Sequence, residues 1–419
     1  MSAPVSSRAR QAARPDPRHS SRPVKQPNSQ LEGQVSRGFE AVADAFAENF
    51  TQRGELGGAC CVYYLGDKVV DLWGGVRNQA TGEPWQEDTM VLVYSTTKGL
   101  AAMTLALAHS RGWLDYEKRV ATYWPEFAQN GKETITVRQL LAHQAGLFAL
   151  AEKVDRSIVA DLDRLAAILA RQKPAWKPGT RQAYHAITLG YYENELLRRV
   201  DPEHRSLGQF FQDEIATPLG LDFYIRLPES IPDSRLATIT RPSLLEMVRG
   251  FGFRFSLLAF NPRSNITRAL IGSMLPHDPR RVYARDLEVP AGGGVGTARA
   301  IAYAYGVFAS GGRELALRPE TLDLLSAPPI PATRGFHDAC MKADARFSLG
   351  FMKPGPLMAF GSARAFGMPG SGGSMGFADP ETGIGYGYVT SGMGTVLSGD
   401  PRDLALRNAV QTAIRARQR

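Results

Sequence analysis

The stretch of residues 90–107 constrains the fold of this chain more than any other. A short apolar run ends at Tyr94, and an Ala- and Leu-rich helical pattern follows it. Ser95 and Lys98 stand at this junction, and residues three apart share one face of a helix. Ser95 also lies at the predicted helix N-terminus, where free N–H groups favour negative charge. The pair therefore suits a nucleophile with its base, although a capping serine beside a solvated lysine gives the same pattern.

The positive charge of the chain is concentrated at its N-terminus. Of a formal net charge of +8, residues 1–30 contribute +5, with six Lys or Arg against one Asp. Five prolines and few large apolar residues make this segment unsuited to a packed core. We therefore expect residues 1–35 to form a disordered basic tail, either a solvated leader or a weak anchor to an acidic surface. The remaining body does not indicate nucleic-acid binding.

The sequence shows neither a secretory h-region nor an apolar run long enough to cross a bilayer. Three cysteines, Cys60, Cys61 and Cys340, do not form a disulfide framework. We expect a cytoplasmic protein, with peripheral membrane contact left open. The seven histidines show no metal-binding spacing, so no metal is expected. No other cofactor is expected either.

Periodicity predicts a helix over residues 36–52 and two strands over residues 58–73, with a turn at Gly66-Asp67 and an end at Gly74-Gly75. Helical patterns then dominate to about residue 225. Further on, helices are predicted over 297–310 and 403–415, and strands over 347–352, 373–378 and 383–390. The order indicates an α+β fold in which an α/β layer is interrupted by a helical block.

We therefore divide the chain into an α/β domain of residues 36–110 and 291–419 and a helical domain of residues 111–290. Within the latter, residues 227–290 are Pro-rich and irregular. They hold an apolar cluster that includes Phe255 and Phe260. Long irregular inserts often serve as lids or pocket walls, although a structural subdomain fits equally well.

Four motifs follow one another along the chain: Val93–Gly99, Thr134–Leu147, Trp176–Thr180 with Tyr184-His185-Ala186, and Phe366–Gly373. Together they resemble class C-type serine β-lactamases and penicillin-binding proteins, and above all their esterase branch, the family VIII carboxylesterases. Val93–Gly99 is similar to the nucleophile motif of this family, and Thr134–Leu147 is similar to its "TIRHLLTHTSGL" signature. The two later motifs resemble its second and third catalytic elements.

This resemblance implies a β-lactamase/transpeptidase-like fold, with an antiparallel sheet flanked by helices, an all-helical domain, and the site between them. Ser95 is then the nucleophile and Lys98 its base. Tyr184 is the general acid/base, with a phenol made more acidic by the nearby ammonium. The backbone N–H groups of Ser95 and Ser371 are the expected oxyanion hole.

Two departures from the β-lactamase pattern favour an esterase. Ala186 stands where Tyr-x-Asn has its Asn, and Met368-Pro369-Gly370 replaces Lys-Thr-Gly. We expect a lipase-like serine carboxylesterase that hydrolyses short- to medium-chain acyl esters of small molecules, with weak or no β-lactamase activity. The alternatives are a true β-lactamase, a D-amino-acid peptidase, an acyltransferase, or an inactive scaffold with this fold. The oligomeric state stays open.

The expected substrate-binding residues come from the catalytic motifs and the insert. They are Met368, Gly370, Gly372, Ala186, His185, Phe255 and Phe260. Gly372–Gly376 also fits the Gly-x-Ser-x-Gly elbow of α/β-hydrolases, but that fold needs a histidine after the serine. The last histidine is His337, so the elbow is rejected. The glycines at positions 292–294 and 296 do not complete a dinucleotide-binding motif, and we interpret them as a turn on the cleft rim.

Overall fold

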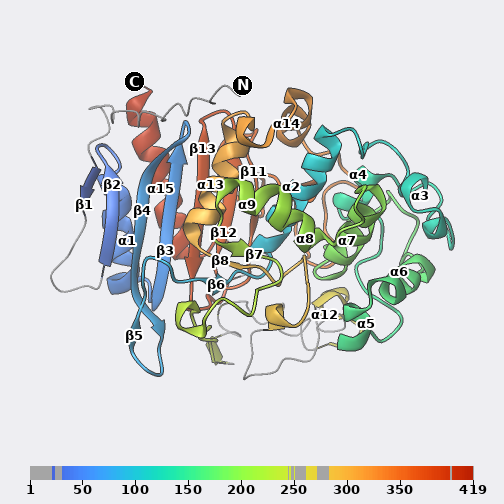
Figure 1. Cartoon of the computed structure of the whole chain (residues 1–419), viewed down its shortest axis with the longest axis horizontal. Coiled ribbons are helices and arrows are strands. Elements are labelled where there is room, and N and C mark those ends of the chain that lie inside the picture. Colours follow the sequence, from blue (N-terminus) through green and yellow to red (C-terminus); the bar gives the residue numbers. More distant parts are fainter. Residues whose placement is uncertain are drawn as a thin grey trace, which may run out of the picture.

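The computed structural model of the chain describes residues 21–23, 31–243, 245–246, 250, 261–270, 283–396 and 399–418. A ten-stranded antiparallel sheet forms the centre of the described chain, in the order β1-β2-β4-β3-β13-β12-β11-β10-β9, with β5 paired to β4 (Figure 1). Its strands are β1 Ser21–Pro23, β2 Leu31–Ser36, β3 Gly57–Tyr64, β4 Asp67–Asn78, β5 Glu83–Pro84, β9 Phe347–Ser348, β10 Phe351–Met352, β11 Phe366–Pro369, β12 Met375–Asp379 and β13 Ile384–Thr390.

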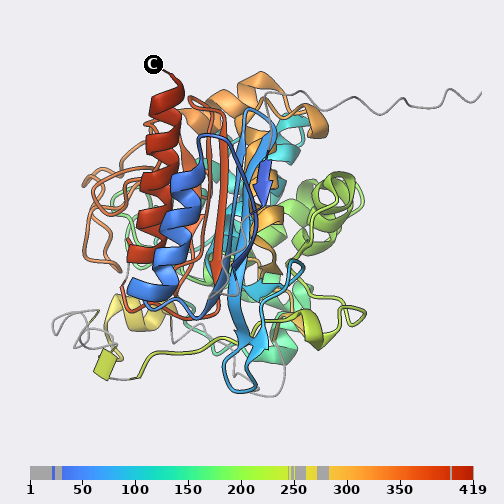
Figure 2. The same ribbon diagram turned by 90° about the vertical axis from the view of Figure 1, so that its left-hand side faces the viewer.

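Helices cover both faces of this sheet. On one face, α1 (Glu40–Gln52) and α15 (Pro401–Arg417) pack against each other, as Figure 2 shows. On the other face, α13 (Ala298–Ala309) crosses β13, β3 and β12, and α14 (Pro319–Ser326) lies nearby. The helix α2 (Thr96–Ser110) packs against β11 on one side and against α7 (Thr188–Val200) on the other. Its N-terminus therefore lies where the sheet meets the helical part.

The helical part holds short elements around the buried helices α2 and α7. They are α3 Val120–Tyr123, α4 Val137–Leu141, α5 Arg156–Ala160, α6 Leu162–Arg171, α8 Leu207–Phe211, α9 Thr217–Leu219 and α12 Asn265–Leu270. Local sequence explains several starts: Thr136 caps α4 in a capping box with Gln139. A small antiparallel sheet, β6 (Val91–Leu92), β8 (Val295–Gly296) and β7 (Phe223–Tyr224), ties this part to the segment before α2.

Several predicted boundaries need correction. The expected disordered tail reaches too far, because residues 31–36 form β2, which pairs with β4 and buries Leu31 and Val35. The second predicted strand does not end at Gly74-Gly75, since β4 runs on to Asn78 and pairs with β5. The turn before it lies one residue earlier than expected: Leu65 and Gly66 both have positive φ, as a type I′ hairpin requires.

Residues 347–352 are two short strands rather than one, because Leu349 and Gly350 turn the chain back on itself. The division into an α/β and a helical domain stays a prediction. Strands cross its proposed limits, since β7 lies within residues 111–290 but pairs with β8.

The contact between α13 and the sheet depends on glycines. A Cβ on Gly385 of β13 would stand 2.2 Å from the backbone nitrogen of Gly306 on α13 and 2.4 Å from the carbonyl oxygen of Ala302. No L side chain fits there unless the helix moves away from the sheet.

We therefore predict that Gly385→Ala lowers the free energy of unfolding by about 3 kcal/mol, at the upper end of overpacking effects. Gly220→Ala is the comparison, because nothing lies within 4 Å of its Cβ position. Its positive φ is then the only source of strain in the alanine variant. It should cost about 1 kcal/mol. Urea denaturation of both variants measures the difference, and equal losses would contradict the close packing.

Candidate active site

Ser95 stands at a sharp turn between strand and helix. The strand β6 ends at Leu92, Tyr94 takes a left-handed conformation with φ 46°, and α2 begins at Thr96. A positive φ at a bulky non-glycine residue is strained and persists only where the surroundings hold it. Here the carbonyl groups of Val93 and Tyr94 accept hydrogen bonds from the first N–H groups of α2. The turn leaves Ser95 partly exposed at the helix N-terminus.

Lys98 is fully buried one turn into α2, and its amine has three oxygen neighbours. Nζ lies 3.1 Å from Ser95 Oγ, 2.6 Å from the carbonyl oxygen of Ala186 and 2.7 Å from that of Ala291. Burial lowers the pKa of Lys98 to about 7. In its neutral form the amine donates its two hydrogens to the two carbonyl groups, which leaves the lone pair facing the Ser95 hydroxyl.

Tyr184 is the second residue that contacts this hydroxyl. Its phenol donates a hydrogen bond to Ser95 Oγ at 3.0 Å, its ring stacks on Phe347, and the Lys98 amine lies 5.0 Å from the ring centroid. Burial raises the pKa of the Tyr184 phenol well above its ordinary value. The expectation of an acidified phenol beside an ammonium was therefore wrong, because burial favours the neutral form of both groups.

The turn after β11 carries a second amide that has no hydrogen-bond partner within the described residues. Gly370 N donates to Ser374 O at 2.7 Å, and Gly373 N donates to Gly370 O at 3.2 Å, so Ser371 lies at the exposed tip. Within the described residues, the amide N–H groups of Ser95 and Ser371 have no hydrogen-bond partner. Such free N–H groups are what an oxyanion hole offers.

Gly370 allows this turn to come close to the nucleophile segment. A Cβ at this position would stand 2.2 Å from the carbonyl oxygen of Val93 and 2.2 Å from Ser374 Oγ. Ser374 joins the two segments directly, because its hydroxyl donates to Val93 O at 3.0 Å. This buried hydroxyl agrees with the rejection of Ser374 as an elbow nucleophile.

Arg402, which sequence reasoning missed, holds the far side of the turn. Its buried guanidinium donates to the carbonyl oxygens of Gly372 at 3.0 Å and Gly392 at 2.8 Å, and pairs with Asp400 at 2.7 Å. Gly394 N also donates to Gly372 O at 2.9 Å. No local signal marks this arginine, since it opens a C-terminal helix far along the chain.

Comparison with known proteins decides the family. Residues 42–411 match the family model described as Beta-lactamase. The chain belongs to this family. It is 34% identical over 364 residues to Esterase/beta-lactamase LipL of Mycobacterium tuberculosis. The aligned region covers 84% of this chain and 80% of LipL.

Solved structures agree with this assignment. A crystal structure of a family VIII carboxylesterase is 35% identical and superposes with a TM-score of 0.80, covering 91% of this chain and 99% of that one. A penicillin-binding protein homologue from Caulobacter crescentus is 34% identical, with the same TM-score and coverage. The expected β-lactamase/transpeptidase-like fold is confirmed, and the protein is a serine hydrolase of the esterase type.

Three predicted substrate-binding residues are buried in the interior instead. Both rings of the His185–His143 pair are fully buried, and His185 Nε2 accepts a hydrogen bond from Leu147 N at 2.9 Å. His185 therefore supports the polypeptide rather than a substrate. Met368 packs in the core between the sheet and its helices, and Ala186 belongs to a separate buried apolar cluster that includes Phe148. Ala186 acts at the site through its carbonyl group.

The predicted acyl-pocket residues Phe255 and Phe260 lie outside the described residues. Ile266 of the described helix α12, in the same insert, belongs to the buried cluster of Phe148, against which Tyr184 packs. The glycines at 292–294 are buried beneath the site and not on its rim, and Gly294 N donates to Thr97 Oγ1 at 2.9 Å.

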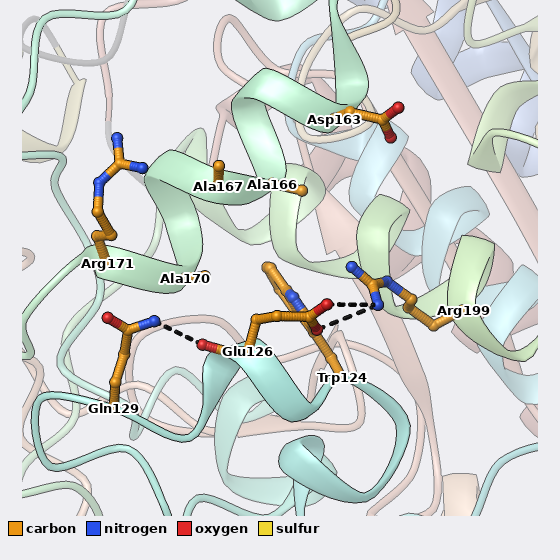
Figure 3. A pocket seen from close by; sticks show the side chains of 9 residues that line it. All are labelled: Trp124, Glu126, Gln129, Asp163, Ala166, Ala167, Ala170, Arg171 and Arg199. Atoms are coloured by element: carbon orange, nitrogen blue, oxygen red, sulfur yellow. Dashed lines mark hydrogen bonds and ion pairs between the residues drawn. The ribbon is translucent and has the colours of Figure 1, made fainter.

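Other features lie away from this chemistry. A pocket of about 380 Å³ lies on the helical part, and Figure 3 shows the side chains that line it. Among them Glu126 and Arg199 pair at 3.1 Å. None of Ser95, Lys98 and Tyr184 lines this pocket. Among the described residues, no group of His, Cys, Asp and Glu has a metal-binding arrangement. No helix in the described ranges is both long and apolar enough to cross a membrane.

The environment of Lys98 predicts a pH profile. Below its pKa of about 7 the amine is protonated and cannot accept the Ser95 proton. The value of kcat/KM for a p-nitrophenyl ester should therefore rise with pH, roughly tenfold per unit at low pH, and level off above about pH 7. Rates measured between roughly pH 5 and 9 check this. A profile that is flat over that range would rule out Lys98 as the titrating base.

Proposed function

We propose that the protein is a serine carboxylesterase that hydrolyses short- to medium-chain acyl esters of small molecules through an acyl-serine intermediate. One observation carries the proposal: the Ser95 hydroxyl lies within hydrogen-bond reach of both the Lys98 amine and the Tyr184 phenol. The names of its relatives, an esterase/β-lactamase and a family VIII carboxylesterase, support the same reaction class.

In the acylation step, Ser95 Oγ attacks the ester carbonyl carbon and its proton passes to the lone pair of Lys98. The resulting ammonium donates three hydrogen bonds, and the carbonyl oxygens of Ala186 and Ala291 already lie in place for two of them. The carbonyl oxygen of the ester gains negative charge, which the amide N–H groups of Ser95 and Ser371 stabilise. The hydrogen bonds are set before the reaction begins, so little reorganisation is needed.

Collapse of the tetrahedral intermediate breaks the bond to the alcohol. The leaving oxygen takes a proton from the Tyr184 phenol, which recovers one from the Lys98 ammonium, and the acyl group stays on Ser95. A water molecule then attacks the acyl-serine with the same groups acting in reverse. Because burial holds its pKa high, Tyr184 acts as a proton relay and does not rest as a phenolate.

We infer that the acyl group lies beside Tyr184, where the described neighbours are apolar and mostly buried. Ile266 and Ala269 of α12 pack with Phe148 in a cluster that Tyr184 and Leu270 also contact. Each methylene group buried there contributes up to roughly 0.8 kcal/mol. A short or medium acyl chain fits the chemistry of this surface better than a charged one.

We predict that Ser95→Ala removes nearly all ester hydrolysis, by at least about a thousandfold, while the fold is kept. The partly exposed side chain makes no packing contribution that alanine would lose. Turnover of p-nitrophenyl butyrate and labelling by a fluorophosphonate measure the effect, with circular dichroism as the control for folding. A folded Ser95→Ala protein that keeps most of its activity would show that another residue is the nucleophile.

The same acylation chemistry could open a β-lactam, but two polar contacts are missing. At the position of the family's Asn, Ala186 places only a methyl group, which is buried in an apolar cluster. At the position of the family's Lys, Met368 is buried and apolar. A hydrogen bond to a charged group contributes about 1.5–3 kcal/mol, so these losses cost one or more factors of ten.

We therefore predict that kcat/KM for nitrocefin is orders of magnitude below that for a short-chain p-nitrophenyl ester. Parallel assays on one enzyme preparation give the ratio, and Ser95→Ala gives the background for both substrates. If wild-type protein hydrolysed nitrocefin as fast as the ester, the β-lactamase alternative would replace the esterase proposal. Acyl transfer to an added alcohol in the same assay would favour the acyltransferase alternative.

A further inference from the structure

The turn of residues 370–374 between β11 and β12 is fixed at its two ends. At one end, a Cβ on Gly370 would stand 2.2 Å from the carbonyl oxygen of Val93. At the other end, the hydroxyl of Ser374 donates to that same oxygen at 3.0 Å. These contacts place the turn against the segment that carries Ser95. Neither of them acts on the peptide groups in the middle of the turn.

The middle of this turn has little stiffness of its own. Gly372 and Gly373 take positive φ values of 92° and 117°, in the region that glycine enters without steric cost. Because glycine has no Cβ, the peptide groups around it rotate at small cost, so hydrogen bonds must set their direction. The direction matters here, since an oxyanion hole at this turn would use the backbone N–H of Ser371.

Two hydrogen bonds in series connect the Ser371 amide with Arg402. Arg402 Nη2 donates to the carbonyl oxygen of Gly372 at 3.0 Å. The same peptide group carries the N–H of Gly373, which donates to the carbonyl oxygen of Gly370 at 3.2 Å. That carbonyl group in turn shares a peptide group with the Ser371 N–H. In a trans peptide group the C=O and the N–H point in opposite directions, so a fixed oxygen also fixes the hydrogen on the other side.

Arg402 also holds the segment that supplies the second donor to this turn. Gly394 N donates to the carbonyl oxygen of Gly372 at 2.9 Å, and Arg402 Nη1 donates to Gly392 O in the same segment at 2.8 Å. The guanidinium lies directly against the turn, because a Cβ on Gly373 would stand 3.1 Å from Nη2. Both restraints on the Gly372 carbonyl group therefore depend on one buried side chain.

The ion pairs of Arg402 do not by themselves account for its burial. Its guanidinium pairs with Asp400 at 2.7 Å and with Glu55 at 3.4 Å, and all three side chains are buried. A buried ion pair is weak evidence for stabilisation, because desolvation offsets the attraction between the charges. The planar fork of donors has a different advantage, since it holds several acceptors in one geometry. The acceptors that it holds here belong to the turn and to its neighbouring segment.

We propose that Arg402 is a positioning residue for the oxyanion hole: through the two peptide groups it directs the Ser371 N–H toward the carbonyl oxygen of the ester. The inference rests on the proposed function, which makes this N–H a donor to the tetrahedral intermediate. A donor fixed before the reaction stabilises the charge that develops in the transition state more than it stabilises the bound ester. Loss of Arg402 therefore acts on kcat more than on KM.

The test compares two substitutions of Arg402. Arg402→Met removes every donor of the side chain, and loss of one oxyanion-hole donor lowers kcat roughly 100- to 1,000-fold. We expect kcat for p-nitrophenyl butyrate to fall about a hundredfold, with KM changed less than about threefold. Arg402→Lys keeps the charge and can still donate to one of the two carbonyl groups, so it should recover part of the lost kcat.

A second readout reports on the oxyanion hole itself. A trifluoromethyl ketone with a butyl chain reacts with Ser95 to form a hemiketal anion, and the oxygen of this anion takes the place of the oxyanion. Its inhibition constant should rise in the Arg402 variants by the same factor by which kcat/KM falls, as expected for a transition-state analogue. An arginine that only stabilises the fold would lower the melting temperature without producing this correlation.

Arg407 provides the matched control on the same helix. It is also buried, pairs with Asp403 at 2.7 Å and donates to the carbonyl oxygen of Ala359, which lies before β11 and outside the turn. Arg407→Met should lower the melting temperature and leave both kcat and the inhibition constant of the ketone near the wild-type values.

A double substitution tests the route through the amide. Ser371→Pro removes the amide hydrogen, because proline has no backbone N–H. If Arg402 acts through this amide, adding Arg402→Met to Ser371→Pro should cost little further activity. Independent effects would instead multiply.

Parallel losses of kcat and of ketone affinity in the Arg402 variants, absent in Arg407→Met and not multiplied in the double variant, support the proposal. Wild-type values in a folded Arg402 variant overturn it and leave the esterase proposal intact. Equal losses in Arg407→Met, multiplied losses in the double variant, or failure of both Arg402 variants to fold also overturn it. If wild-type protein neither turns over esters nor binds the ketone, the proposed function fails and this inference fails with it.

Discussion

The burial of one amine organises the site. Lys98 is fully buried, and two carbonyl groups from distant segments, those of Ala186 and Ala291, receive its hydrogens. A charged amine at this position would cost much more free energy than a neutral one, which is why burial brings its pKa to about 7. An ordinary lysine thus obtains a pKa near neutrality, as the proposed role of Lys98 as the base requires. The position of α2 between sheet and helical part makes the burial possible.

The turn that carries Ser371 depends on a second buried charge of a different kind. Arg402 holds the carbonyl groups of Gly372 and Gly392, and Asp400 and Glu55 balance its charge. A buried and fully paired arginine contributes little to the free energy of folding, but its planar donors fix the positions of several acceptors at once. Helix α15, which covers the sheet face away from α13, therefore reaches through its first turn to the loop carrying Ser371. The first helix and the last strands of the fold meet at this point.

Much of this could be predicted from the sequence, because the decisive signals are local. The helix after Ser95 follows from its Ala- and Leu-rich pattern, and the structure confirms it. The motif resemblance gave the correct family and fold. Errors arose where pairing partners decide the outcome. Residues 31–36 have no strong strand pattern, and only the neighbouring edge of β4 makes them a strand.

The sequence alone determined which groups we propose for the chemistry: a hydroxyl and an amine three residues apart at a helix N-terminus, with a tyrosine in a recognisable motif. Only the tertiary structure decided how those groups are ionised and which neighbours serve the site. His185, Met368 and Ala186 stand in the right motifs but direct their side chains into the interior. Burial and the distance between charges depend on contacts between distant segments. No local sequence signal therefore shows that the pKa of Lys98 is lowered while that of Tyr184 is raised. The same holds for the contacts of Arg402 and for the buried carboxyl group of Glu193, which has no hydrogen-bond partner within the described chain.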